Sequence, residues 1–132
     1  MSKKKTISLD FDGVCHQYTT EWKRANIISD PPVDGLFEFL DSIIEQFDIV
    51  IFSSRNYYLD GILSMSEWFE IYYYKWIENG GKPKNLKNGF WANLSFPSKK
   101  PDAFIFIDDH NLSFDGNWPT INELSNFKPW NK

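Results

Sequence analysis

Residues 7–14 read ISLDFDGV: an apolar strand that ends in two carboxylates, Asp10 and Asp12, with a glycine directly after them. Successive side chains on a strand project to opposite faces, so Asp10 and Asp12 would share one side while Phe11 points into the packing. Two carboxylates this close repel each other unless a cation lies between them or one of them holds a proton. A hairpin turn is the rival interpretation, because Asp-Gly is a strong turn signal. The rest of the chain decides between the two.

The composition predicts one globular domain over residues 1–132, with 42% hydrophobic and 24% charged residues. The basic start is followed by an apolar run too short for a signal peptide or a membrane span, so we expect a cytoplasmic protein with no membrane partner. Cys15 is the only cysteine, which agrees with a reducing compartment and indicates a buried thiol. The net charge of -4 argues against a broad electrostatic grip on nucleic acid.

Apolar runs with strand and helix periods alternate along the chain. The expected strands are 6–11, 48–55 and 103–109, with a further short one in 89–96, and the expected helices lie within 30–47, 64–79 and 120–127. Asp30, Ser64 with Glu67, and Thr120 with Glu123 are the expected helix caps. The aromatic stripe of helix 64–79 could stack on nucleic acid bases, but its helical spacing favours packing against the sheet, with Tyr74 left exposed.

This alternation predicts an α/β fold of the Rossmann-like type, a parallel sheet flanked by helices. Ligands of such sheets bind outside the carboxyl ends of the strands. The polar residues expected at those ends are Asp10, Asp12, Ser53, Ser54, Asp108 and Asp109. Four converging acids require a cation, and Mg²⁺ is a hard ion that carboxylates and phosphate oxygens hold. Ser53 and the amides after Gly13 could then hold a phosphate, with Lys100 balancing its charge.

Four segments in this order resemble the motifs of the haloacid dehalogenase (HAD) superfamily of magnesium-dependent phosphohydrolases. They are DFDGV, the serine after IVIF, the lysine of KKPDAF and the IDD that closes a strand, and together they cover about residues 6–110. The resemblance implies a three-layer α/β/α fold. It also implies no cap domain, because residues 13–48 and 56–98 suffice only for a flap, two helices and a loop. The tail is similar to that of small capless members from bacteria and phages.

The resemblance implies a role for each motif residue. Asp10 would be the nucleophile that becomes an aspartyl-phosphate, and Asp12 the general acid and base. Asp12 would need a raised pKa to carry a proton, which a neighbouring carboxylate provides. Ser53, or Ser54 if the strand is one residue longer, would hold the phosphoryl group.

The remaining roles concern charge and metal. Lys100 fits the third motif better than Lys99. Asp108 would bind Mg²⁺ together with Asp10, with Asp109 as ligand or supporting group and the main-chain carbonyl of Asp12 completing the set. The substrate-binding candidates are Gly13, His16, Ser54 and Arg55, the last because its fork suits a phosphate or a carboxylate.

The predicted function is therefore a magnesium-dependent phosphomonoester hydrolase that acts through an aspartyl-phosphate. Without a cap the site would admit a nucleotide, a nucleic acid end or another bulky phosphate, and a second copy of the chain could cover it as a homo-oligomer. Two alternatives use the same fold. One is a phosphotransferase with the same residues, and the other is a binding module without turnover.

Overall fold

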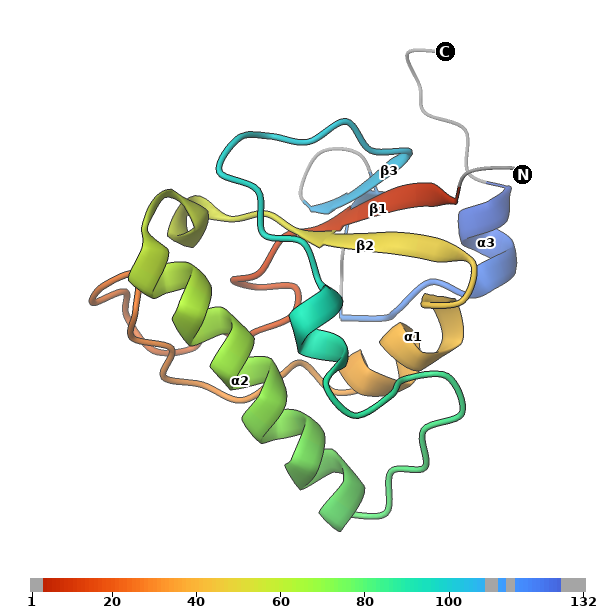
Figure 1. Ribbon diagram of the computed structural model, residues 1–132, viewed down its shortest axis with the longest axis horizontal. Helices are drawn as coiled ribbons and strands as arrows, with labels where there is room; N and C mark the ends of the chain where they lie inside the picture. Colours follow the sequence, from red (N-terminus) through yellow and green to blue (C-terminus); the bar gives the residue numbers. More distant parts are fainter. Residues whose placement is uncertain (1–3, 109–111, 114–115, 127–132) are drawn as a thin grey trace.

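The computed structural model describes residues 4–108, 112–113 and 116–126, and they form an α/β fold around one parallel sheet (Figure 1). The sheet has the strand order β2-β1-β3-β4. Its strands are β1 (Lys5–Leu9), β2 (Phe47–Ile51), β3 (Ile105–Asp108) and β4 (Leu112–Ser113), and each neighbouring pair is parallel. The expected α/β class and parallel sheet are therefore confirmed.

The helices lie where the sequence predicts them, with different ends. They are α1 (Leu36–Ile43), α2 (Leu59–Glu78) and α3 (Ile121–Ser125), and the short 3₁₀ helices η1 (Ser54–Tyr57) and η2 (Phe90–Asn93) complete the set. In Figure 1, α1 and the long α2 lie below the strands, and α3 lies at the right of the view. The capping box of Thr120 and Glu123 at the start of α3 is confirmed.

Two of the expected caps are wrong. Helix α2 begins at Leu59, so Ser64 lies inside it and caps nothing. Asp30 is used elsewhere, because its carboxylate accepts hydrogen bonds from the amide and hydroxyl of Thr20 at 2.7 and 2.6 Å. Gly35 takes the N-cap position of α1, with a φ of 88° that glycine adopts without strain.

The expected short strand in 89–96 is also wrong over most of its length. Residues Phe90–Asn93 form η2, and only Ser95 makes a bridge, to Val50 of β2. Phe90 is buried against aromatic rings of α1 and α2, including Phe37 and Tyr73. The aromatic residues of this segment therefore pack against helices. Its composition alone did not reveal this, because aromatic residues are also typical of strands.

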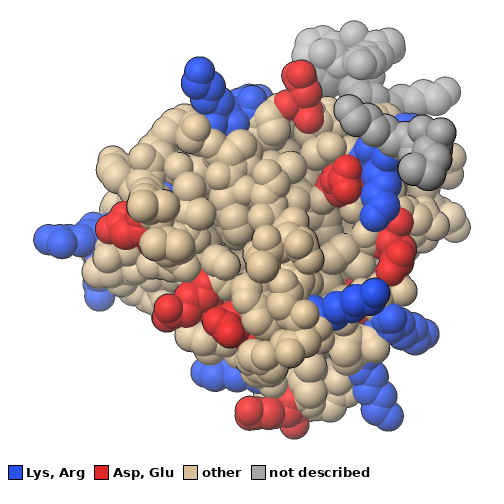
Figure 2. Space-filling view, in the orientation of Figure 1, with Lys and Arg blue, Asp and Glu red and all other residues tan. Residues whose placement is uncertain are grey.

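Charge is scattered on the surface visible in Figure 2. Lys and Arg side chains lie mostly around the outline of this face with acidic side chains between them, and its centre is largely uncharged. This face therefore offers no broad positive surface to a polyanion.

No described helix is apolar and long enough to pass through a bilayer.

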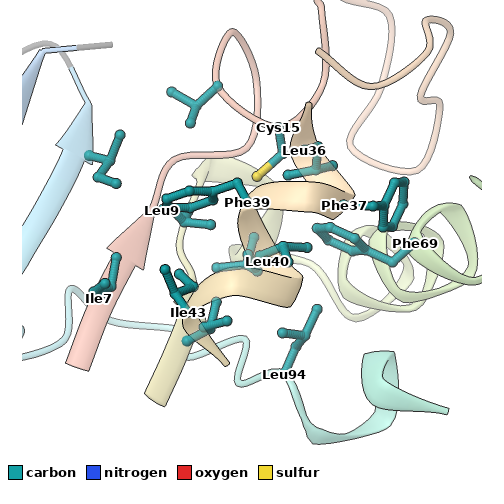
Figure 3. Close-up of a cluster of buried hydrophobic side chains, with 14 of the residues drawn as sticks. Ile7, Leu9, Cys15, Leu36, Phe37, Phe39, Leu40, Ile43, Phe69 and Leu94 are labelled. Carbon is teal, nitrogen blue, oxygen red and sulfur yellow. The ribbon is translucent and has the colours of Figure 1, made fainter. Parts of the chain in front are cut away.

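The core lies between one face of the sheet and the helices. Figure 3 shows side chains of α1 between β1 and α2, with Leu36, Leu40 and Ile43 near Leu9 and Phe69. From α2 the core receives Met65, Trp68, Phe69 and Tyr73, all buried, while Tyr74 is 42% exposed. The packing interpretation of the aromatic stripe is confirmed for its buried aromatic members, whose rings contact Phe11, Phe37 and Phe90.

The strand register shows which residues lie on the core face of the sheet and which lie on the opposite face. Leu9 pairs with both Ile51 and Ile107, and all three belong to the buried core. One residue earlier, Ser8 pairs with Val50 and Phe106 on the opposite face. Directly after Leu9, the amide of Asp10 donates to the carbonyl of Ile107 at 3.2 Å, and the amide of Phe52 donates to the carbonyl of Leu9 at 3.0 Å. The carboxyl ends of the three strands thus meet at one edge, as the sequence predicts.

A substitution at Gly61 tests how closely α2 approaches η1. A Cβ built at Gly61 would lie 2.4 Å from the carbonyl oxygen of Arg55 and 3.2 Å from Cβ of Ala25. We expect Gly61→Ala to destabilise the protein by about 2 kcal/mol, because the backbone must shift despite the better helix propensity of alanine. Urea unfolding measures the change, and Glu67→Ala at an exposed site of α2 is the control. A more stable Gly61→Ala variant would contradict the close approach.

Candidate active site

A pocket of about 310 Å³ opens at the carboxyl edge of the sheet. It is lined by Ser8, Asp10, Phe52, Ser53, Ser54, Tyr57, Lys100 and Phe106. Four of these, Asp10, Ser53, Ser54 and Lys100, are residues that the sequence motifs single out, and they come from three separate parts of the chain. The structure thus brings a carboxylate, two hydroxyls and an ammonium group to one cavity.

The turn after β2 holds the two serines. Oγ of Ser53 accepts a hydrogen bond from the Arg55 amide at 3.0 Å, and Oδ1 of Asn56 accepts one from the Ser53 amide at 3.1 Å. The amide group of Asn56 then donates to the carbonyls of Ile51 and Pro97, both at 2.8 Å. Ser53 is buried and caps η1, whereas Ser54 is exposed, and both line the pocket. The structure therefore does not decide whether Ser53 or Ser54 would hold the phosphoryl group.

Lys100 reaches the pocket from the loop before β3. Its ammonium group lies 4.8 Å from the centroid of the Phe106 ring, a cation–π contact that directs the long side chain along the pocket wall. Lys99 is not among the lining residues. The geometry therefore favours Lys100 over Lys99 for the third motif.

Arg55 does not line this pocket. It is 1% exposed, and its guanidinium donates to both carboxylate oxygens of Asp12 at 3.1–3.2 Å. Its Nη1 donates to the carbonyls of Arg24, Ala25 and Ile27 at 2.8–3.2 Å. The expectation that Arg55 contacts substrate is therefore corrected: its donors are taken up by the protein, and it positions Asp12 and the loop of residues 24–27.

His16 is likewise a positioning residue rather than a substrate contact in this structure. It is 1% exposed, and its Nδ1 lies 2.9 Å from Oδ1 of Asp12. Its Nε2 accepts a hydrogen bond from the Asp30 amide at 3.0 Å, so the ring proton belongs on Nδ1, which donates to Asp12. Burial and two satisfied ring nitrogens explain why His16 does not extend toward a ligand.

The electrostatics of Asp12 also differ from the expectation. Burial raises its pKa, but the hydrogen bonds from His16 and Arg55 and the charge of Arg55 outweigh burial, so the pKa lies below its ordinary value of 3.8. The prediction of a raised pKa is wrong because it considered only the repulsion from Asp10. Asp12 is therefore an ionised carboxylate at neutral pH in this arrangement.

The amides of the loop after the first motif donate hydrogen bonds within the loop. Gly13, at a φ of 85°, donates to the carbonyl of His16 at 2.7 Å. The amides of Val14, Cys15 and His16 all point at the carbonyl of Phe11, at 2.9–3.3 Å. The expectation that Gly13 and the amides after it bind a phosphate is therefore wrong for this structure, because these amides already donate to backbone carbonyls.

Cys15 is confirmed as a buried thiol. It is fully buried, and its Sγ lies 3.5 Å from the carbonyl oxygen of Asp10. Burial and the nearby charges of Asp10 and Asp12 raise its pKa well above its ordinary value. A thiolate nucleophile at this position is thus disfavoured.

The expected metal ligands are only partly described. Asp10 lines the pocket, and Asp108 ends β3, with its side chain outside what the structure describes. Asp109 lies outside the described residues. Within the part of the chain that the structure describes, no three His, Cys, Asp or Glu side chains form a metal-binding group. Among the described pocket residues, Asp10 is the carboxylate that could hold a cation.

Sequence reasoning missed the aromatic walls of the pocket, Phe52, Tyr57 and Phe106, and the small side chain of Ser8 at its base. A signal for Ser8 and Phe52 exists, since strand alternation places both on the face of Asp10. For Tyr57 there is none, because the turn of η1 that carries it depends on Asn56 bonding to Ile51 and Pro97.

We expect Arg55→Ala to lower the free energy of unfolding by about 3 kcal/mol, because it leaves the half-buried charge of Asp12 without its cation. Urea unfolding measures the loss. Arg24→Ala, which removes an exposed arginine side chain from the loop that Arg55 holds, is the control and should cost less than about 0.5 kcal/mol. Equal, small losses in both variants would show that the ion pair does not hold the loop.

The chain was compared with known proteins at the level of family models, curated sequences and solved structures. No family model, curated protein or solved structure matches it. The likeness of its motifs to the HAD superfamily therefore stands on the residues of this chain alone.

Proposed function

We propose that the protein is a magnesium-dependent phosphomonoester hydrolase in which Asp10 is the nucleophile. The observation that carries the proposal is the pocket that Asp10 shares with Ser53, Ser54 and Lys100. A carboxylate, hydroxyl donors and a cation in one open cavity are the groups that phosphoryl transfer through a covalent intermediate requires.

The strand order supports a HAD-type fold as part of this proposal. Asp10 and Asp12 follow β1, which lies between β2, the strand that precedes Ser53, and β3, the strand that ends in Asp108. This order places all motif-bearing strand ends at one edge, where parallel sheets bind ligands. The three-layer arrangement and the absence of a cap domain belong to the same proposal.

The residues at this edge fit Mg²⁺. Asp10 in the pocket supplies the hard carboxylate oxygens that Mg²⁺ prefers. We propose Asp108, the last residue of β3, as a second ligand. Asp109 and the main-chain carbonyl of Asp12 are the further ligands that we propose. When bound, the ion would neutralise charge on the phosphoryl oxygens and on Asp10.

The chemistry of the chain itself takes two steps. A carboxylate oxygen of Asp10 attacks phosphorus, the bond to the leaving oxygen breaks, and Lys100 and a serine hydroxyl bind the transferring group. Water then cleaves the aspartyl-phosphate, releasing phosphate and regenerating Asp10. The ionised state of Asp12 suits this second step, in which it would accept a proton from water.

The ionised Asp12 also guides the choice of substrate for a test. Protonation of a poor leaving group would require Asp12 to gain a proton against the hydrogen bonds from His16 and Arg55. An aryl phosphate needs no such proton, because its leaving group departs as a stable anion. We therefore expect aryl phosphates to be hydrolysed readily. The physiological substrate that we propose is a phosphorylated small molecule or nucleic acid end, met in a cytoplasmic setting.

Hydrolysis of 4-nitrophenyl phosphate by the purified protein tests the proposal. We expect turnover with Mg²⁺, its loss with chelator, and a decrease of at least about a thousandfold in kcat for Asp10→Asn, with an unchanged melting temperature. Asp48→Asn, the same change at an exposed site of β2, is the control and should keep full activity.

Two results would contradict the proposal. Turnover in Asp10→Asn equal to that of the wild type would remove Asp10 as nucleophile. Turnover that chelator leaves unchanged would remove the metal from the reaction.

A further inference from the structure

We infer that the pocket selects phosphate esters that carry a planar ring, and that Tyr57 is the residue that binds the ring. The inference rests on the proposed function and deepens it by naming the chemical class of the substrate. Its evidence is the composition of the pocket, the exposure of Tyr57 and the rigidity of the turn that carries it.

The pocket combines two kinds of wall. Asp10, Ser53 and Lys100 supply the polar groups at which a phosphate would react, and Phe52 and Phe106 supply aromatic surface beside them. Tyr57 lines the same cavity. A volume of about 310 Å³ lies at the lower end of the range of small-molecule sites. The cavity thus suits one phosphate with one ring system rather than a large ligand.

Tyr57 is the wall whose ring is most accessible to a ligand. It is 65% exposed, whereas Phe52 and Phe106 are half-buried, and the Phe106 ring already contacts the Lys100 ammonium. Among the aromatic contacts of the described residues, none involves Tyr57. Packing within the chain therefore does not account for this large side chain.

The backbone of Tyr57 is held in place despite this exposure. It ends η1, whose capping box joins Ser53 and Asn56, and Asn56 anchors the turn to β2 and to Pro97. An aromatic ring on a fixed backbone binds a flat ligand at a low entropic cost. Stacking tolerates different rings, so the shared chemistry is a phosphate ester of either a nucleoside or a phenol.

Steady-state kinetics of Tyr57→Ala tests the inference with three substrates: a nucleoside 5′-monophosphate, 4-nitrophenyl phosphate and glycerol phosphate, which has no ring. We expect KM to rise roughly tenfold for the two ring-bearing esters and to stay unchanged for glycerol phosphate. Tyr57→Phe, which keeps the ring, should behave as the wild type. A comparison of the wild-type kcat/KM values of the two ring-bearing esters shows whether the pocket prefers the ring of a nucleoside or that of a phenol.

Tyr58→Ala is the matched control. Tyr58 is 56% exposed and follows directly in the chain, but it lines a different pocket, with Trp22 and Arg24. We expect it to leave all three KM values unchanged. An equal rise of KM for glycerol phosphate in Tyr57→Ala, or no rise for any substrate, would overturn the inference.

Failure of the proposed function is separated from failure of this inference by a binding measurement. If the wild type hydrolyses none of the three esters, calorimetric titration with the nucleoside 5′-monophosphate still measures ring binding. Affinity about tenfold weaker in Tyr57→Ala than in Tyr58→Ala would support the ring site without hydrolysis. Equal affinities, or no binding to the wild type, would overturn it.

Discussion

The ion pair between Arg55 and Asp12 is the contact on which the candidate site depends. Asp12 follows β1, Arg55 follows β2, and the same guanidinium holds three carbonyls of residues 24–27, so a single side chain joins three segments that are distant in sequence. Removing two charges from water is costly, and the cost is offset here because the hydrogen bonds of the guanidinium are made with good geometry. His16 adds a further donor to Asp12 and connects it to Asp30.

This pairing divides the two acids of the first motif between two tasks. Asp10 lines the pocket with Ser53 and Lys100. Asp12 is held by hydrogen bonds from His16 and Arg55, which lower its pKa and keep it ionised. The repulsion that two neighbouring carboxylates would suffer is thus relieved by Arg55 on one of them, and in our proposal by Mg²⁺ on the other. The turn that follows β2 then adds an exposed ring, Tyr57, to the pocket that in our proposal binds the phosphate.

The sequence predicted the parallel sheet and the meeting of Asp10, Ser53 and Lys100, because apolar strands with polar ends follow from local periodicity. It did not predict the burial of Arg55, because Asp12 and the carbonyls of residues 24–27 are distant in sequence and only the folded backbone brings them to Arg55. It did not predict the burial of His16, because that depends on the more distant Asp30 amide as well as on Asp12. The direction of the Asp12 pKa was missed for the same reason. The start of α2 was missed because Leu59 and Leu63, both exposed, conceal its amphipathic pattern.

Mass spectrometry of the protein after rapid acid quenching would detect the aspartyl-phosphate that we propose. During turnover of 4-nitrophenyl phosphate with Mg²⁺, we expect a fraction of the protein to carry one phosphoryl group, and fragmentation should locate this group on Asp10 and not on Asp12. The adduct should be absent from Asp10→Asn. A phosphoryl group on any other residue would show that Asp10 is not the nucleophile.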